Sequence, residues 1–307
     1  MSTVVTKGNP QDFFLQQSEI PNKGRFDISC SNHITGYSHH PTRYGIKFVL
    51  SGSESYEVNH HEYCVNSGTY LLVNKDQYHE FEVKQQQPSK ALCIGIDEML
   101  LQDVYYTLTS SDHQLLEQPD SVTGSELEFL EMVYTTGNNS LGQYLMNVKA
   151  GIYKNRESLP IPEEELYYST AYHLILSQTP LLKQMSRLPA RKKGTSQELY
   201  KRLYHAKAII DDYCLQPLPI EALCKEVALS EFHFYRSFKK AFGLSPHQYY
   251  LQQKLEKAKQ LLLSHQHNIT DVALHCGFAD LPSFRKAFKK AFAYSPLSFI
   301  KQAGLNN

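Results

Sequence analysis

The side chains with the clearest potential for binding chemistry are basic, and they occur in two copies of one short pattern. The chain reads FYRSFKKAFGLSP over Phe234–Pro246 and FRKAFKKAFAYSP over Phe284–Pro296. Each copy carries two adjacent lysines, and the first copy also carries Arg236. A lysine ammonium group binds phosphate, and an arginine guanidinium pairs with guanine through two hydrogen bonds. The pattern therefore predicts two copies of one nucleic-acid-binding element.

Both copies have the periodicity of a helix with one buried face. Their aromatic residues recur at i, i+4 and i+8, so the rings form one stripe while the lysines lie on another face. A shorter apolar segment precedes each copy, Ile220–Ser230 before the first and Ile269–Ala279 before the second. We expect two helix-turn-helix motifs, at about residues 218–242 and 268–292, each with its second helix in the major groove of DNA.

Turn and capping residues support this arrangement. Ala228 and Gly277 lie where the first helix of each motif must end and the chain must turn sharply. Ser230 and Asp280 offer side-chain oxygens that cap the following helix. Between the motifs, Ser245–Ser264 begins with a capping box and continues with leucines at helical spacing. A helix of about five turns is therefore expected to join the two motifs.

The stretch Thr195–Ala303 resembles the DNA-binding domain of the AraC/XylS family of bacterial transcription regulators. The resemblance rests on the turn Cys276-Gly277-Phe278, the FKK core of both second helices, both Ser-Pro caps and the lead-in TSQELYKRL. The family's DNA-reading positions, carried over one at a time, fall on Phe232, Tyr235, Arg236, Leu281, Pro282 and Lys286. Lysines expected to bind the DNA backbone are Lys239, Lys240, Lys289 and Lys290.

The second motif departs from the family pattern. This chain has Pro282, Ser283, Lys286 and Ala293 where members commonly have Ser, Tyr, Arg and Gly. Proline is tolerated in the first turn of a helix, so Pro282 need not break it. Leu281 and Pro282 cannot form paired hydrogen bonds to base edges, whereas Arg236 can. We therefore predict that the first motif reads more of the DNA sequence; the alternative is that Arg236 and Lys286 only hold phosphates.

Charge and composition bound the class of protein. The 307 residues have a net charge of zero, but residues 191–307 contain 18 Lys and Arg against 9 Asp and Glu, and residues 1–190 contain 13 against 22. This asymmetry favours one domain that binds DNA and one that does not. No apolar run approaches 18 residues and no signal peptide is evident, which predicts a cytoplasmic protein without membrane contact. The six cysteines form no CxxC pair, so we expect reduced cysteines and neither a zinc site nor a cofactor.

The N-terminal part alternates short β-rich runs with turn residues. The runs are FDISC, YGIKFVL, SYEV, EYCV, TYLLV, HEFEV and ALCIGI. With the DNA-binding domain downstream, residues 21–97 resemble the cupin-like sensor barrel of AraC-type proteins, and the phrases at Val49–Gly52 and Ser67–His79 fit that pattern. The expected fold class is therefore multidomain: a cupin-like β-barrel with an α-helical dimerisation segment, then an all-α tandem helix-turn-helix domain.

The resemblance implies a small-molecule effector within the barrel. Candidate ligand-binding residues are Tyr37, His39, Arg43, Lys47, Tyr56 and His79. Arg43 would anchor a carboxylate or phosphate, but Arg43 and Lys47 could equally be solvated strand residues. His79 lies near one metal-ligand position of catalytic cupins, but His39 and His40 are adjacent and would point to opposite faces of a strand. A metal-dependent cupin enzyme fused to a DNA-binding domain is the weaker alternative to a non-enzymatic sensor.

The remaining segments complete the expected organisation. Residues 1–20 form an arm, residues 98–187 a helical dimerisation region, residues 188–194 a linker and residues 195–307 the DNA-binding domain. Within the helical region, Leu127, Leu130 and Tyr134 begin one amphipathic face, and Glu163–Gln184 supplies another. We expect a ligand-responsive homodimer that binds double-stranded DNA and activates transcription through RNA polymerase. An architectural DNA-binding protein without an effector is the other alternative.

Overall fold

The fold is known from a computed structural model. It describes residues 3–7, 14–39, 42–111, 113–114, 127–137, 139–189, 193–215, 218–264 and 268–302. Within this range the side chains of residues 3–7, 14, 31–39, 78–79, 83–87 and 193 are not described. The chain divides into two compact units, Met1–Leu182 and Lys183–Asn307, and each is treated by itself below.

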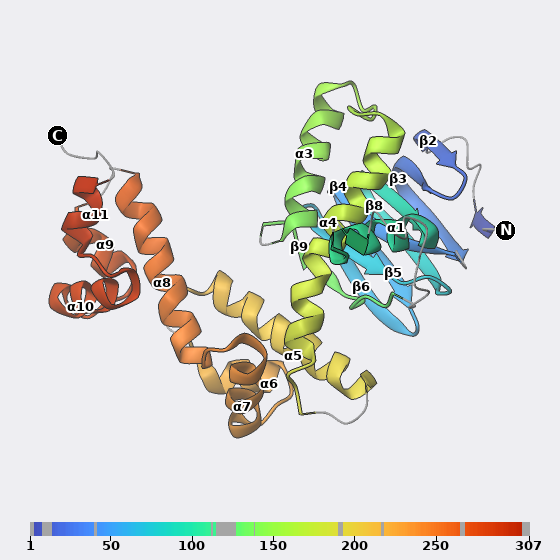
Figure 1. The fold of residues 1–307 in the computed structure, drawn as a ribbon. Helices are drawn as coiled ribbons and strands as arrows, with labels where there is room; N and C mark the ends of the chain where they lie inside the picture. Colours follow the sequence, from blue (N-terminus) through green and yellow to red (C-terminus); the bar gives the residue numbers. More distant parts are fainter. Residues whose placement is uncertain are drawn as a thin grey trace. The chain divides into compact units, whose positions relative to one another are not determined.

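The N-terminal unit is built on one antiparallel sheet (Figure 1). Its strands are β1 (Thr3–Lys7), β2 (Phe14–Ile20), β3 (Gly24–His39), β4 (Arg43–Ser51), β5 (Ser53–Val58), β6 (His61–Asn66), β7 (Thr69–Val73), β8 (Tyr78–Asp97) and β9 (Val133–Thr135). All seven runs expected from the sequence lie in strands, and the last two form the single long strand β8. Two strands, β1 and β2, lie within the segment expected to form an arm, and both pair with β3.

Strand β8 organises the sheet because it pairs with three other strands. Its C-terminal half lies between β3 and β4, where Cys93 is opposite both Asp27 and Lys47. Its N-terminal half lies between β3 and β5, where Phe81 is opposite Gly36 and Tyr56. The strand order is β1-β3-β8-β4-β7-β9, with β2 beside β3 and with β5 and β6 branching from β8. The pairings among the described residues leave this sheet open, which corrects the closed barrel expected from the sequence.

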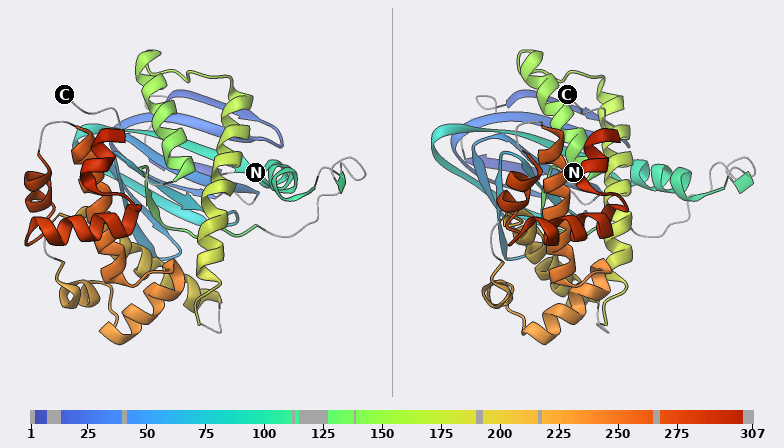
Figure 2. Two further views of the ribbon diagram at one scale, coloured as in Figure 1. Left: turned by 60° about the vertical axis from the view of Figure 1, so that its left-hand side comes forward. Right: turned by 90° about the vertical axis from the view of Figure 1, so that its left-hand side faces the viewer.

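Two helices cover one face of the sheet, α3 (Ser140–Lys154) and α4 (Glu163–Met185) (Figures 1 and 2). Helix α3 begins where the Asn139 side chain accepts a hydrogen bond from the Gly142 backbone, and its buried residues Leu141, Leu145, Val148 and Ile152 recur at helical spacing. Helix α4 packs closely on the sheet, since a β-carbon at Gly24 would lie 2.7 Å from the Tyr167 ring. A further helix, α1 (Glu98–Thr109), follows β8 directly.

The segment before α3 is extended, not helical. Leu127, Leu130 and Tyr134 have helical spacing, but residues 127–132 have no regular structure and Tyr134 lies in β9. Leu130 and Tyr134 are nevertheless buried, and the Tyr44 hydroxyl donates a hydrogen bond to the Leu127 carbonyl. The apolar residues of this segment are therefore buried against the sheet, and the prediction of a helix here was wrong.

The C-terminal unit is all helical. Its helices are α5 (Lys193–Asp212), α6 (Ile220–Glu226), α7 (Glu231–Phe242), α8 (Pro246–Leu263), α9 (Ile269–His275), α10 (Leu281–Phe292) and α11 (Pro296–Gln302). Helix α8 joins the two motifs, as expected, and begins with a capping box formed by Ser245 and Gln248. In neither unit does the described part of the chain include a helix of the length and apolarity needed to cross a membrane.

Candidate DNA-binding surface and inner face of the sheet

Both helix-turn-helix motifs turn through a left-handed residue. Ala228 in the first motif has φ 50° and Gly277 in the second has φ 69°. The residue after each donates a backbone hydrogen bond of 3.0 Å, Leu229 to the Cys224 carbonyl and Phe278 to the Ala273 carbonyl. The two turns thus satisfy the end of the first helix in the same way, and the positions expected for the turns are confirmed.

The second helix of each motif is capped by the residue expected from the sequence. Ser230 accepts a hydrogen bond from the His233 backbone at 3.4 Å. Asp280 accepts one from the Ser283 backbone at 2.6 Å, and this bond lowers the pKa of the Asp280 carboxyl below its usual value. Pro282 lies in the first turn of α10 and leaves the helix intact.

The interiors of the two motifs are near copies of each other. The ring centroids of Phe234 and Phe238 lie 5.5 Å apart, as do those of Phe284 and Phe288. A third ring follows at the end of each helix. The Phe242 centroid lies 4.6 Å from that of Phe238, and the Phe292 centroid lies 4.6 Å from that of Phe288. The four rings of the two pairs are fully buried. The aromatic stripe in each sequence copy therefore fixes both recognition helices, α7 and α10, against the same kind of core.

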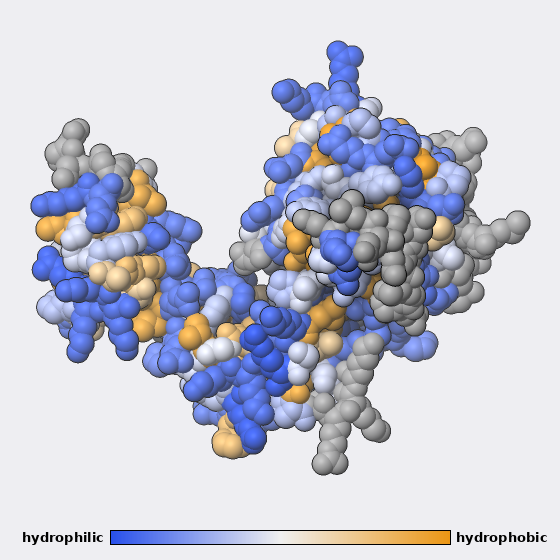
Figure 3. Space-filling model, viewed as in Figure 1, coloured by the Kyte–Doolittle hydropathy of each residue, from blue (hydrophilic) through white to orange (hydrophobic). Residues whose placement is uncertain are grey.

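The predicted DNA-binding side chains lie mostly on the exposed faces of α7 and α10. Exposed are Phe232, Tyr235, Arg236, Lys239 and Lys240 on α7, and Pro282, Lys286, Lys289 and Lys290 on α10. Phe232 is 77% exposed, which is unusual for a phenylalanine and leaves it free to contact a ligand. Leu281 differs from the rest, since it is partly buried and packs on the core of the second motif. Hydrophilic side chains surround smaller apolar areas on the surface of this motif (Figure 3).

One basic residue of the second motif was missed by sequence reasoning. Arg285 is exposed on α10 at the position that Tyr235 occupies on α7, fifty residues earlier. The repeat itself contains the signal, because aligning the two copies places Arg285 beside Lys286 as Tyr235 stands beside Arg236. Both recognition helices therefore expose a guanidinium group that can form paired hydrogen bonds with guanine.

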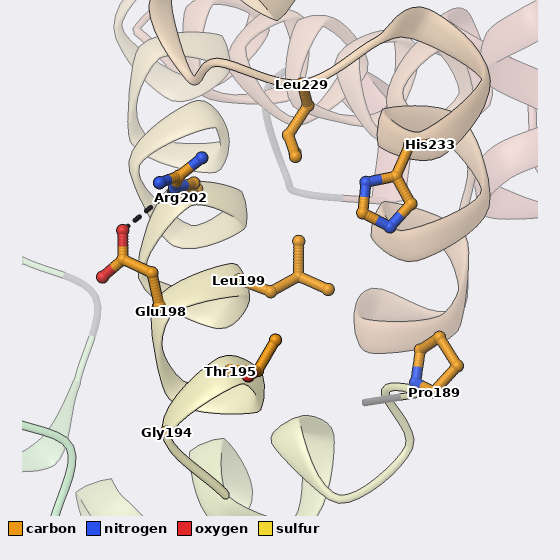
Figure 4. Close-up of a pocket in the computed structure, with 8 residues that line it drawn as sticks. All are labelled: Pro189, Gly194, Thr195, Glu198, Leu199, Arg202, Leu229 and His233. Atoms are coloured by element: carbon orange, nitrogen blue, oxygen red, sulfur yellow. Dashed lines mark hydrogen bonds and ion pairs between the residues drawn. The ribbon is translucent and has the colours of Figure 1, made fainter. Parts of the chain in front are cut away.

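A pocket of about 580 Å³ lies between the start of α5 and the first motif (Figure 4). Its walls come from the start of α5, from Leu229 in the turn and from His233 on α7. Leu199 and Leu229 project into it, and Arg202 forms an ion pair with Glu198 on one side at 2.9 Å. Arg202 also donates a hydrogen bond to the Ala228 carbonyl, so α5 supports the turn of the first motif directly.

In the N-terminal unit, the candidate ligand-binding residues have different surroundings. Lys47 and Tyr56 are buried on the face of the sheet opposite the helices, which we call the inner face. Arg43 is only 11% exposed and forms ion pairs with Asp97 at 3.1 Å and Glu19 at 2.5 Å. Arg43 is thus not a solvated strand residue; its Nε and Nη2 bind carboxylates, and its Nη1 is buried without a hydrogen-bond partner among the described residues. Tyr37, His39 and His79 lie outside the described side chains.

Sequence reasoning missed four further polar residues on or beside the inner face, namely Asp27, Glu54, Ser89 and Cys93. Glu54 is buried and accepts hydrogen bonds from the Tyr56 hydroxyl at 2.5 Å and the Ser89 hydroxyl at 2.8 Å. Burial raises the pKa of the Asp27 carboxyl to about 6 and the pKa of the Cys93 thiol well above its usual value. The inner face therefore carries a polar, largely desolvated group of side chains.

Two family models match the chain, one for each of these regions. A model described as an AraC-like ligand binding domain matches residues 28–171, and a model described as a helix-turn-helix domain matches residues 223–302. The first match runs from within β3 to the first part of α4, and the second runs from within α6 to the end of α11. The chain belongs to the AraC/XylS family of transcription regulators. It is therefore a DNA-binding AraC-family regulator with an attached ligand-binding domain.

Named relatives of this AraC-family regulator are also transcription regulators, a class of protein that is not enzymatic. The Msm operon regulatory protein of Streptococcus mutans is 25% identical over 285 residues, 90% of this chain and 94% of that protein. The transcriptional activator RhaS of Escherichia coli O157:H7 is 24% identical over 258 residues, 84% of this chain and 85% of that protein. The crystal structure of ToxT from Vibrio cholerae is 12% identical, with a TM-score of 0.33 over 91% of this chain and 97% of that one.

Proposed function

We propose that this AraC-family regulator reads one asymmetric double-stranded DNA site with both α7 and α10 and responds to a small molecule bound at the inner face. The observation that carries the DNA-reading proposal is the repeat: each recognition helix exposes a guanidinium group and a pair of lysines above the same aromatic core. Arg236 and Arg285 read bases, and the lysine pairs hold phosphates. Since the target is chromosomal DNA, we place the protein in the cytoplasm.

Helix α8 sets the spacing of the two readers. It contains 18 residues, which corresponds to about 27 Å of helix. Two helices that enter the major groove from one side of DNA are separated by about one helical turn, or about 34 Å. A bridge of this length, together with the capped turns at its ends, supports simultaneous binding of α7 and α10 to adjacent segments of the groove.

The proposed output is activation through contact with RNA polymerase. The relative RhaS is named a transcriptional activator, and it aligns with 84% of this chain. The ligand-binding domain gives the regulator a place to sense its effector, and the effector acts by favouring one arrangement of the protein over another.

We further propose a homodimer formed by α4. On the exposed side of α4, Tyr168, Tyr172 and Leu176 recur at i, i+4 and i+8. Glu165 precedes this apolar stripe and Lys183 follows it, and both are exposed. Two copies of α4 packed antiparallel, centred near residue 174, would bring Tyr172 against Leu176 of the second copy and Glu165 against its Lys183. The stripe is therefore complementary to itself, as a two-fold interface requires.

The dimer is tested by sedimentation of the full chain. Leu176→Glu should convert a dimer to a monomer, because it places a charge at the centre of an apolar contact. The control is Leu108→Glu on α1, another exposed leucine, which should leave the mass unchanged. Exchanging the charges in one chain, as Glu165→Lys with Lys183→Glu, should preserve the dimer, whereas either single change should weaken it. A wild-type monomer at micromolar concentration would overturn the interface.

The DNA-reading proposal is tested by incubating the purified protein with sheared genomic DNA and sequencing the fragments that it retains. We expect two unlike sequence boxes about one helical turn apart. The double variant Arg236→Ala with Arg285→Ala should retain DNA without enriching these boxes. Enrichment of a single box would contradict joint reading by α7 and α10. Retention without sequence preference by the wild type would favour an architectural role.

A further inference from the structure

Three polar side chains form a row across the inner face of the sheet. Asp27 on β3 and Lys47 on β4 both lie opposite Cys93, which occupies the strand between them. Neighbouring strands are about 4.8 Å apart, so the backbones at Asp27 and Lys47 are separated by about 10 Å. The next inner-face residue of β4, Val49, belongs to a buried apolar cluster with Tyr56 of β5, and this cluster borders the row. An acid and a base thus lie two strands apart on the same face of the sheet.

The Lys47 ammonium group has no partner among the residues that the structure describes. The residue is only 8% exposed, and it forms no hydrogen bond or ion pair with any described residue. The two oxygens of the nearby Glu54 carboxylate are already occupied by the Tyr56 and Ser89 hydroxyls. The ammonium group can therefore donate hydrogen bonds to an acceptor of a bound molecule.

Asp27 is the opposite charge in this row. Burial is the main cause of its raised pKa, and the positive charges of Lys47 and Arg25 oppose the effect only in part. The Cys93 thiol donates a hydrogen bond to it, which is a weak compensation for a desolvated carboxylate. The Asp27 and Cys93 side chains both keep part of their surface accessible. The carboxylate is therefore reachable and lacks a strong cationic donor.

The neighbouring row of the inner face leaves room for an occupant. Gly45 and Gly95 lie opposite each other on β4 and β8. A β-carbon added at Gly45 would meet no atom closer than 3.7 Å, and its second neighbour would be the Lys47 side chain at 3.8 Å. Space for at least one methyl group therefore adjoins the Lys47 side chain.

We propose that the inner face binds a small zwitterion of the α-amino-acid type, with its carboxylate on Lys47 and its ammonium group on Asp27. The inference rests on the proposed effector binding and specifies its chemistry. A zwitterion would give each of these two charges a hydrogen-bonding partner of opposite charge. A neutral polyol would leave both uncompensated, a dianion would be repelled by Asp27 and Glu54, and a simple cation would be repelled by Lys47 and Arg25.

The test is thermal unfolding of the full chain with each of the twenty proteinogenic α-amino acids at millimolar concentration. Matched compounds are the 2-hydroxy acid and the primary amine with the same side chain, together with a sugar alcohol. At least one amino acid should raise the unfolding temperature of the N-terminal unit, and its hydroxy acid and amine should not. Lys47→Met and Asp27→Asn should each abolish this shift, while the surface variant Lys154→Met should retain it.

One of these variants also separates a binding role from a structural one. Without ligand, Asp27→Asn should raise the unfolding temperature at pH 8, because it removes a carboxylate whose ionised form is disfavoured by burial. A lower unfolding temperature or a failure to fold would show that Asp27 stabilises the sheet, and would overturn the proposal. A shift produced equally by polyols or hydroxy acids would overturn the zwitterion and leave effector binding intact. No shift with any compound would overturn both the zwitterion and effector binding at the inner face. DNA retention, measured separately, would still test the DNA-reading proposal.

Discussion

In the first helix-turn-helix motif the rings of Phe234 and Phe238 lie 5.5 Å apart, and the equivalent rings of the second motif, Phe284 and Phe288, lie 5.5 Å apart. The surfaces above these cores differ. Helix α7 presents Phe232 where α10 presents Pro282. The buried residues of the two copies have the same geometry because a packed core tolerates few changes, while the exposed residues differ between the copies.

The turns differ as well. Four residues, 227–230, separate α6 from α7, and five residues, 276–280, separate α9 from α10. Each motif has two left-handed positions, one in the turn and one after the recognition helix. Alanine occupies the first and glycine the second in the first motif, Ala228 and Gly243, whereas Gly277 and Ala293 reverse this order. The two motifs thus have left-handed residues at the same two positions. Glycine removes the strain after the recognition helix in the first motif and in the turn in the second.

The largest expected effect tests the shared core. Phe238→Ala and Phe288→Ala should each destabilise their motif by about 3–5 kcal/mol, because each removes a fully buried ring and leaves a cavity. Phe232→Ala, which removes an exposed ring from the same helix, is the control and should leave stability nearly unchanged. The measurement is urea unfolding of the full chain followed by far-ultraviolet circular dichroism. A much smaller loss in one motif would break the equivalence of the two cores.

The next effect tests the divergent surfaces. Arg236→Ala and Arg285→Ala should each weaken binding to the selected site by about 1–3 kcal/mol and relax specificity in a different box. Fluorescence anisotropy with the site and with a scrambled duplex would separate specific from non-specific loss. Equal losses on both duplexes would show that the guanidinium groups only hold phosphates. A loss confined to Arg236 would confirm the expectation that the first motif reads more of the sequence.

A smaller effect tests the alternating alanines and glycines. Ala228→Gly and Ala293→Gly should stabilise their motifs by about 0.5–1 kcal/mol, because a left-handed backbone strains a residue with a β-carbon. Gly243→Ala should cost about 1 kcal/mol. Gly277→Ala should cost somewhat more, since its β-carbon would also lie 3.0 Å from the Lys254 ammonium nitrogen. Thermal unfolding of the four variants ranks their stabilities. Stabilisation by either glycine-to-alanine change would contradict the expected ranking.

The smallest effect concerns the lysines that the two motifs share. Lys240→Ala and Lys290→Ala should each reduce the slope of log affinity against log salt by about one, as expected for one lost phosphate contact. Lys225→Ala is the control, because this exposed lysine on α6 forms an ion pair with Glu221 and is not expected to meet DNA. An unchanged slope for one motif would mean that its lysine pair faces away from the duplex.

The sequence predicted the C-terminal unit more closely than the N-terminal one. The helix α8 was expected within Ser245–Ser264 and spans Pro246–Leu263, because a serine cap, a proline and a capping-box glutamine mark its start chemically. Arg285 escaped attention because a family comparison position by position passed over it, although the internal repeat pointed to it.

In the N-terminal unit, apolar spacing gave the wrong structure for Leu127–Tyr134, since an extended segment lying on a sheet buries side chains at irregular intervals. Asp27 and Glu54 were missed for a different reason. Alternation along a strand predicts that charged residues face solvent, whereas here the charged face points inward. Burial of polar groups depends on which strands meet, and that information is not local to any strand.

The continuous helix α8 also limits how this regulator can evolve. One residue inserted into it would turn the second motif by about 100° relative to the first, and only insertions close to whole turns would restore the phase. Changes of base preference need single substitutions on α7 or α10, but a change in the interval between the two boxes needs a coordinated insertion. In proteins descended from this one, the base sequence of each DNA box should therefore change long before the spacing between the two boxes changes.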